Sequence, residues 1–308
     1  MNRWRNLTLA GLMLTYVQLV LGGIVRITGS GMGCGDHWPM CNGSWIPPFT
    51  SPLVMIEWTH RLVAALVGLT IATLAGAAWV WRSRPGIGGR GGLLRPAATA
   101  AALVVAVALF GALTVKLGNP PLATLAHWTL AMTLVGVLVA ATVRTGALGG
   151  TAAAAQGGTP RSVRSLSAGA ALAFGAVVLG GLVAKVPGGA AACPSFPLCG
   201  TSPDATYGGV RDIHMLHRIF AFALVFHAVA VTSAIRRRAG EATVVRRAAT
   251  IAAGLVLLQV AFGVMMVLAS LPPALRIAHE AIGVAVWLAM FAAAYVARTA
   301  SGTVGARA

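Results

Sequence analysis

The chain has 308 residues, of which 57% are hydrophobic and only 9% are charged, with a mean hydropathy of +0.82. Soluble domains carry about 25% charged residues, so this composition excludes an ordinary soluble protein. The formal net charge of +17 would suit a nucleic-acid-binding protein, but the placement of the basic residues argues against that partner.

Apolar runs of about 20 residues recur along the whole chain. A helix of that length matches the hydrocarbon thickness of a bilayer. We therefore predict an all-α integral membrane protein with eight transmembrane helices. The first run is too long for a signal-peptide core and has no cleavage site of small residues after it, so we expect it to be retained. In chain order the runs cover residues 7–25, 53–81, 96–117, 122–143, 166–186, 210–235, 248–271 and 275–297.

The basic residues concentrate on one side of this predicted topology. Most of the 23 Lys and Arg residues lie before the first run, after the second, fourth and sixth runs, or at the C-terminal end. Cytoplasmic loops of membrane proteins carry an excess of Lys and Arg. We therefore predict a multi-pass protein of the cell membrane with both termini in the cytoplasm, and this placement accounts for the net charge without nucleic acid.

The second half of the sequence repeats the first. The segment "FGALTVKLGNPPLATLAHWTLA" at 110–131 aligns without a gap on "FGVMMVLASLPPALRIAHEAIG" at 262–283, and "EWTHRLVA" at 57–64 aligns on "HMLHRIFA" at 214–221. Residues 22–41 align in the same way on residues 180–199. The whole set of four helices is thus predicted to be duplicated.

The duplication predicts how the chain is organised. Each half has an even number of helices, so both halves insert in the same orientation. We expect two tandem four-helix bundles related by a pseudo-twofold axis along the membrane normal. The N-terminal half would cover 1–143, a flexible Gly/Ala-rich cytoplasmic linker 144–165, and the C-terminal half 166–308.

Four histidines occupy matched positions near the outer ends of the even-numbered helices: His60, His127, His217 and His279. A single membrane histidine is more often an interhelical hydrogen-bonding residue. Two histidines at one depth on alternate helices, repeated in both halves, favour a haem clamped between helices. Zinc or copper is the alternative, but zinc usually takes three or four protein ligands.

An arginine follows one of these histidines in each half. Arg61 follows His60, and Arg218 follows His217. A buried arginine needs an anionic partner, and a haem propionate would suit it because arginine pairs with carboxylates through two hydrogen bonds. The alternative is that these side chains extend to the outer interface. Arg276 has the same two interpretations.

Glu57 is the most informative difference between the halves. It lies three residues before His60 and so on the same helix face, whereas the equivalent residue of the second half is His214. A carboxyl group beside only one haem site favours a part in proton transfer. The alternative is an ion pair with Arg61, four residues later. His214 would take part in proton transfer, contact a haem propionate, or form an interfacial hydrogen bond.

The four cysteines form two pairs in predicted outer loops. Cys34 and Cys41 lie in the first, and Cys193 and Cys199 in the other. Disulfides persist in the oxidising compartment that such loops face, so we predict the bonds Cys34–Cys41 and Cys193–Cys199. A redox role for the first pair is the alternative to a structural one.

Taken together, these residues resemble the haem A synthase family, of the CtaA type. The resemblance rests on eight helices in two halves, the Glu-x-x-His-Arg motif at 57–61, the four matched histidines and the outer cysteine pairs. It covers essentially the whole chain. It implies an enzyme that converts haem O to haem A for terminal oxidases, oxidising the porphyrin C8 methyl group to a formyl group by successive hydroxylation.

The resemblance also implies a role for each site residue. His217 and His279 would ligate a resident haem b as the cofactor, with Arg218 nearby. His60 and His127 would bind the iron of the substrate haem O, with Arg61 beside them. Glu57 would be the catalytic residue. Implied partners are the membrane lipid, haem O synthase (the farnesyltransferase that precedes this step) and an electron donor.

Two other classes of membrane protein share some of these features. A dihaem cytochrome b that carries electrons would explain the four histidines equally well, but not a glutamate in one half only. A transporter built from parallel repeats would explain the duplication. It predicts broken helices at mid-membrane, whereas the polar residues here cluster at the outer end.

Overall fold

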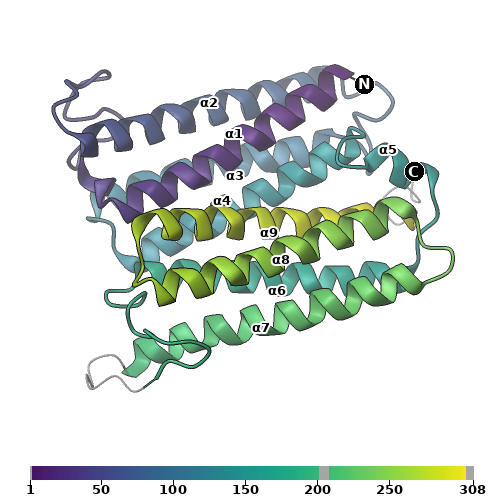
Figure 1. Ribbon diagram of the computed structural model, residues 1–308. Coiled ribbons are helices and arrows are strands. Elements are labelled where there is room, and N and C mark those ends of the chain that lie inside the picture. Colours follow the sequence, from purple (N-terminus) through teal and green to yellow (C-terminus); the bar gives the residue numbers. More distant parts are fainter. Residues whose placement is uncertain (1, 201–207, 303–308) are drawn as a thin grey trace.

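The computed structural model describes residues 2–200 and 208–302 and is shown in Figure 1. The remaining residues of the predicted C-terminal half lie outside this range. Within the described residues, eight helices are long and apolar enough to cross a membrane, which confirms the prediction of an all-α, multi-pass membrane protein. They are α1 (Asn2–Ile27), α2 (Pro52–Val80), α3 (Leu94–Lys116), α4 (Pro121–Arg144), α6 (Pro160–Lys185), α7 (Gly208–Arg237), α8 (Thr243–Leu268) and α9 (Pro273–Ala300).

Proline fixes the start of several helices. Pro121 and Pro273 each stand at the beginning of a helix, after a second proline in extended conformation. Proline suits this position because its ring presets a helical φ and its missing N–H has no helical partner there. Just before these proline pairs the chain reverses through residues with positive φ, Gly118 and Asn119 after α3 and the pair 270–271 after α8. The two predicted Pro-Pro turns are therefore built alike.

The segment between the halves is more ordered than predicted. The predicted linker contains the short helix α5 (Gly150–Ala155) and the first turns of α6. Thr159 caps α6, because its side chain accepts a hydrogen bond from the backbone N–H of Ser162. The apolar pattern missed this start because residues 160–165 are polar, and hydrophobicity reports membrane burial rather than helix length. The boundaries of the halves stay a prediction.

Helices α4 and α9 lie at the centre of the molecule. They have the largest buried share among the spanning helices. Contacts between the predicted halves run from α9 to α1 and α4, and from α4 to α6. The start of α1 and the end of α9 lie at one end of the bundle, opposite the loops that follow α1 and α6 (Figure 1). The pseudo-twofold axis and the side of the membrane stay predictions.

Candidate functional site

One large cavity, of about 1100 Å³, contains most of the side chains singled out by the sequence. Its wall is mainly apolar and comes from both predicted halves. His60, His127, His217 and His279 all contribute to it, as do Glu57, Arg61, His214 and Arg218. The predicted site residues therefore share a single cavity.

Each of the four histidines packs against a glycine of the preceding helix. A Cβ atom added at any of these glycines would lie 3.0–3.3 Å from the ring Cε1 atom, which is closer than ordinary van der Waals contact. Small residues allow helices to approach closely, and here the glycines make room for imidazole rings. The pairs are Gly22 and His60, Gly111 and His127, Gly180 and His217, and Gly263 and His279.

Two of the histidines are oriented by main-chain carbonyl groups. The Nδ1 atom of His127 lies 2.9 Å from the carbonyl oxygen of Val107, and that of His217 lies 3.0 Å from the carbonyl oxygen of Ala176. Each ring donates its Nδ1 proton to this carbonyl, so its Nε2 lone pair is available. This is the tautomer in which histidine binds a metal through Nε2.

The other two histidines contact glutamine side chains that the sequence analysis missed. The Nε2 atom of Gln18 lies 3.0 Å from His60 Nδ1 and 3.2 Å from its Nε2. The Nε2 atom of Gln259 lies 3.2 Å from His279 Nε2. Each glutamine interrupts an apolar run on the helix before its histidine, and this interruption is the signal that could have found it.

The arrangement of the histidines fits a porphyrin iron. His60 lies close enough to His127 to interact with it electrostatically, and His217 is related to His279 in the same way; that each pair binds one iron stays a prediction. Among the described residues no three His, Cys, Asp or Glu side chains converge to hold a metal ion. A haem iron needs two protein ligands at most, because the porphyrin supplies the other four. Two histidines in each half match that requirement.

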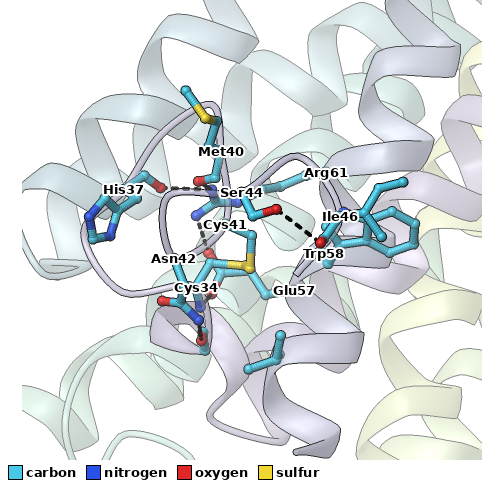
Figure 2. The surroundings of a disulfide bond; sticks show 12 residues. Cys34, His37, Met40, Cys41, Asn42, Ser44, Ile46, Glu57, Trp58 and Arg61 are labelled. Atoms are coloured by element: carbon cyan, nitrogen blue, oxygen red, sulfur yellow. Dashed lines mark hydrogen bonds and ion pairs between the residues drawn. A yellow bond between two sulfur atoms is a disulfide. The ribbon is translucent and has the colours of Figure 1, made fainter. Parts of the chain in front are cut away.

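Glu57 and Arg61 connect α2 to the first cysteine loop (Figure 2). Glu57 is buried; its Oε1 atom lies 2.6 Å from Arg61 Nη2, and its Oε2 atom accepts a hydrogen bond of 2.9 Å from the backbone N–H of Cys34. Arg61 Nη1 also donates to the carbonyl oxygens of His37 and Met40, each at 2.7 Å. The ion pair between Glu57 and Arg61, which the sequence offered as an alternative, is therefore present.

Arg218 contacts the second cysteine loop in the same way. Its guanidinium donates to the carbonyl oxygens of Cys193, Ser195 and Pro197 at 2.7–3.0 Å. His214, the counterpart of Glu57, lies 2.9 Å through Nδ1 from the carbonyl oxygen of Gly189. Both arginines therefore hold a cysteine loop over the cavity. That they bind propionates as well stays a prediction.

Both predicted disulfides are present, Cys34–Cys41 and Cys193–Cys199. Cys41 lines the cavity, and Figure 2 shows the first disulfide above Glu57 and beside Arg61. The bond lies within a loop that is also fastened by the hydrogen bonds of these two residues. A structural role follows from this placement, and a redox role stays a prediction.

An ion pair that the sequence did not assign crosses between the predicted halves. Arg26 near the end of α1 pairs with Glu280 of α9, and Arg26 also donates to the carbonyl oxygen of Ala184 at 3.3 Å. The Glu280 carboxylate lies against Gly23. The equivalent residue of the first half is Trp128, which lies against Gly181 of the second. Each half therefore sends one side chain across to the other.

Comparison with known proteins identifies the family of this chain. The family model COX15-CtaA, described as "Cytochrome oxidase assembly protein", matches residues 5–54 and 49–291. A protein of Geobacillus kaustophilus named "Heme A synthase" is 29% identical over 85% of this chain and 81% of its own length. One of the same name from Bacillus licheniformis is 27% identical over 85% of each chain. A third, from Lysinibacillus sphaericus, is 42% identical over 26% of each chain. The chain belongs to the COX15-CtaA family of cytochrome oxidase assembly proteins.

Proposed function

We propose that this protein is a haem A synthase, a membrane oxidoreductase that converts the C8 methyl group of haem O to the formyl group of haem A. The observation that carries the proposal is the apolar cavity lined by two pairs of histidines. The chain is also similar, over most of its length, to relatives named "Heme A synthase". Two successive hydroxylations of one carbon atom, each needing a two-electron oxidant from outside the chain, would give a gem-diol, and loss of one water molecule would leave the formyl group.

The two histidine pairs have different tasks in this proposal. His217 and His279 hold a resident haem b, which supplies redox chemistry when bound. His60 and His127 hold the substrate haem O. Because the carboxylate of Glu57 lines the cavity on the same helix as His60, it is the side chain that we expect to move a proton at the substrate.

The residues of the chain position the substrate and exclude water. The mainly apolar wall suits a porphyrin that carries a farnesyl-derived tail, since burying apolar surface contributes about 25 cal/mol per Å². Arg61 and Glu57 hold the Cys34–Cys41 loop over this end of the cavity. The Glu57 carboxylate accepts two hydrogen bonds, which fixes its place for proton transfer at the substrate edge.

Pigment extraction from the purified full-length protein tests the proposal. A haem A synthase should yield haem b together with haem O or haem A, and membranes that contain it should form haem A from haem O. The alternative, a dihaem cytochrome b, uses the same four histidines. Two haem b groups per chain, with neither haem O nor haem A in any preparation, would establish that carrier and remove the enzyme.

A further inference from the structure

The groups that support the four histidines occupy equivalent positions of the repeat. In the alignment of residues 22–41 with 180–199, extended back along the helices, Gln18 corresponds to Ala176. In the alignment of 110–131 with 262–283, Val107 corresponds to Gln259. These four residues are the ones that contact the histidine rings. The duplicated fold thus has one supporting position for each histidine.

The support differs in kind between these positions. Val107 and Ala176 offer their main-chain carbonyls, which accept the Nδ1 proton of His127 and His217. At the positions of Gln18 and Gln259 a side-chain amide contacts the ring. Each half contains one support of each kind. In the N-terminal half the glutamine is on the first helix and the carbonyl on the third, whereas in the C-terminal half the carbonyl is on the first helix and the glutamine on the third.

The glutamine contacts are incomplete as they stand. Within the described residues, the Oε1 atoms of Gln18 and Gln259 and the Nδ1 atom of His279 are buried and have no hydrogen-bonding partner. A buried polar atom without a hydrogen-bonding partner destabilises the folded protein. Two unpaired acceptors beside two imidazole rings call for a donor, and a protonated Nδ1 of the neighbouring ring would be one.

An iron bound at Nε2 would supply that donor. A histidine that binds a metal through Nε2 carries its proton on Nδ1 and almost always donates it to an acceptor. A half-turn of the glutamine amide exchanges its oxygen and nitrogen atoms at almost unchanged positions. At His60 this turn brings the Gln18 oxygen to the place of the amide nitrogen, which lies 3.0 Å from Nδ1 and 3.2 Å from Nε2, so the ring must also shift to leave Nε2 free for iron. At His279 the amide nitrogen lies 3.2 Å from Nε2, so the imidazole must turn to bring Nδ1 to the glutamine.

We propose that Gln18 and Gln259 are positioning residues for His60 and His279, accepting the Nδ1 proton of each histidine when its Nε2 atom binds haem iron. The proposal rests on the haem ligation in the proposed function. Each histidine pair then has one ring held by a main-chain carbonyl and one held by a side chain. Because such an acceptor raises the basicity of the ligand, the contact with the glutamine side chain would determine how strongly the histidine donates electrons to the iron.

The test uses the resident haem of the purified full-length protein and the variants Gln259→Leu and Gln259→Glu. Leucine removes the acceptor, so the midpoint reduction potential should rise. Glutamate keeps an acceptor at least as strong, so the potential should stay at or below the wild-type value. Gln156→Leu is the matched control: this glutamine does not line the cavity, and its Oε1 atom accepts a hydrogen bond from the Val244 N–H in the first turn of α8, 15 residues before Gln259, so the potential should not change.

Each outcome decides the question. A parallel shift in both variants, or no shift in either, would overturn the role of Gln259, because a packing role does not distinguish leucine from glutamate in this way. Loss of haem from the leucine variant alone supports the proposal, and loss from both overturns it. Wild-type protein without haem would instead overturn the proposed function, so the two failures are distinguishable.

Discussion

Glu57 and Arg61 form an ion pair, with 2.6 Å between Oε1 and Nη2, and both partners also hold the Cys34–Cys41 loop. The carboxylate that the sequence marked as catalytic is therefore also a structural anchor. Its two oxygens have separate partners, the Arg61 guanidinium and the backbone N–H of Cys34. A substitution that keeps one of these contacts can separate the two roles.

Glu57→Gln is that substitution. The amide oxygen can still accept from the Cys34 N–H, while the negative charge and the basic oxygen are lost. Because general acid–base groups contribute about 100-fold or more to rate, we expect formation of haem A to fall by about that factor. The content of resident haem should be unchanged, as measured by absorption spectroscopy of the purified protein. Formation of haem A at the wild-type rate would refute the catalytic role.

The two histidine pairs should lose different pigments. His217→Ala or His279→Ala removes a ligand of the resident haem b, so purified protein should lack it. His60→Ala and His127→Ala should keep the resident haem and fail to retain haem O. The measurement is the ratio of each extracted haem to protein. If all four variants lost the same haem, the assignment of one pair to the cofactor and the other to the substrate would be wrong.

The glycines behind the histidines give a test of the ring positions. A Cβ at Gly263 would lie 3.1 Å from His279 Cε1, whereas nothing lies within 4 Å of a Cβ at Gly254 on the same helix. Gly263→Val should therefore displace the imidazole and lower the resident haem content severalfold. Gly254→Val faces outward and is the matched control, with haem content unchanged. Equal haem content in both variants would mean that the ring does not occupy this place.

The sequence predicted the fold well because its signals are local. A run of apolar residues fixes a membrane helix by composition alone, and the proline pairs at Pro120 and Pro272 mark helix starts by their own ring geometry. The matched depth of the histidines followed from the internal repeat. Helix α5 was missed because six residues between two glycine-rich stretches carry no hydrophobic period.

The contacts of the polar residues could not be predicted in the same way. The sequence offered Arg61 a haem propionate or the outer interface, and it did not predict the loop carbonyls and Glu57 that contact its guanidinium. Such carbonyls have no signature in the sequence. Aligning the two halves also fails to mark a residue when the equivalent residue of the other half acts through its main-chain carbonyl. For this reason the sequence comparison did not identify Gln18 and Gln259.

The pair of Arg26 and Glu280 should join the predicted halves energetically. Both side chains are largely buried, with 20% and 13% exposure, and they belong to α1 and α9. Removing Glu280 leaves the Arg26 charge beside Arg276 and Lys185 without an anion, and an uncompensated charge costs about 3–5 kcal/mol in buried pairs. We expect Glu280→Gln to lower the free energy of unfolding in detergent by about that amount, Arg26→Met to lower it by less because Arg276 still attracts Glu280, and the double variant to recover part of the loss.

The surface residue Asp36 provides the control for this cycle. It lies 3.6 Å from His37 Nδ1, and both side chains are mostly exposed. Surface pairs contribute only about 0–1 kcal/mol, so Asp36→Asn should leave the free energy of unfolding nearly unchanged. For Arg26 and Glu280 the deciding quantity is the coupling energy of the double-mutant cycle. If the two single effects add to within about 0.5 kcal/mol, the residues act independently. A larger coupling energy means that the two side chains stabilise the protein as a pair that joins the predicted halves.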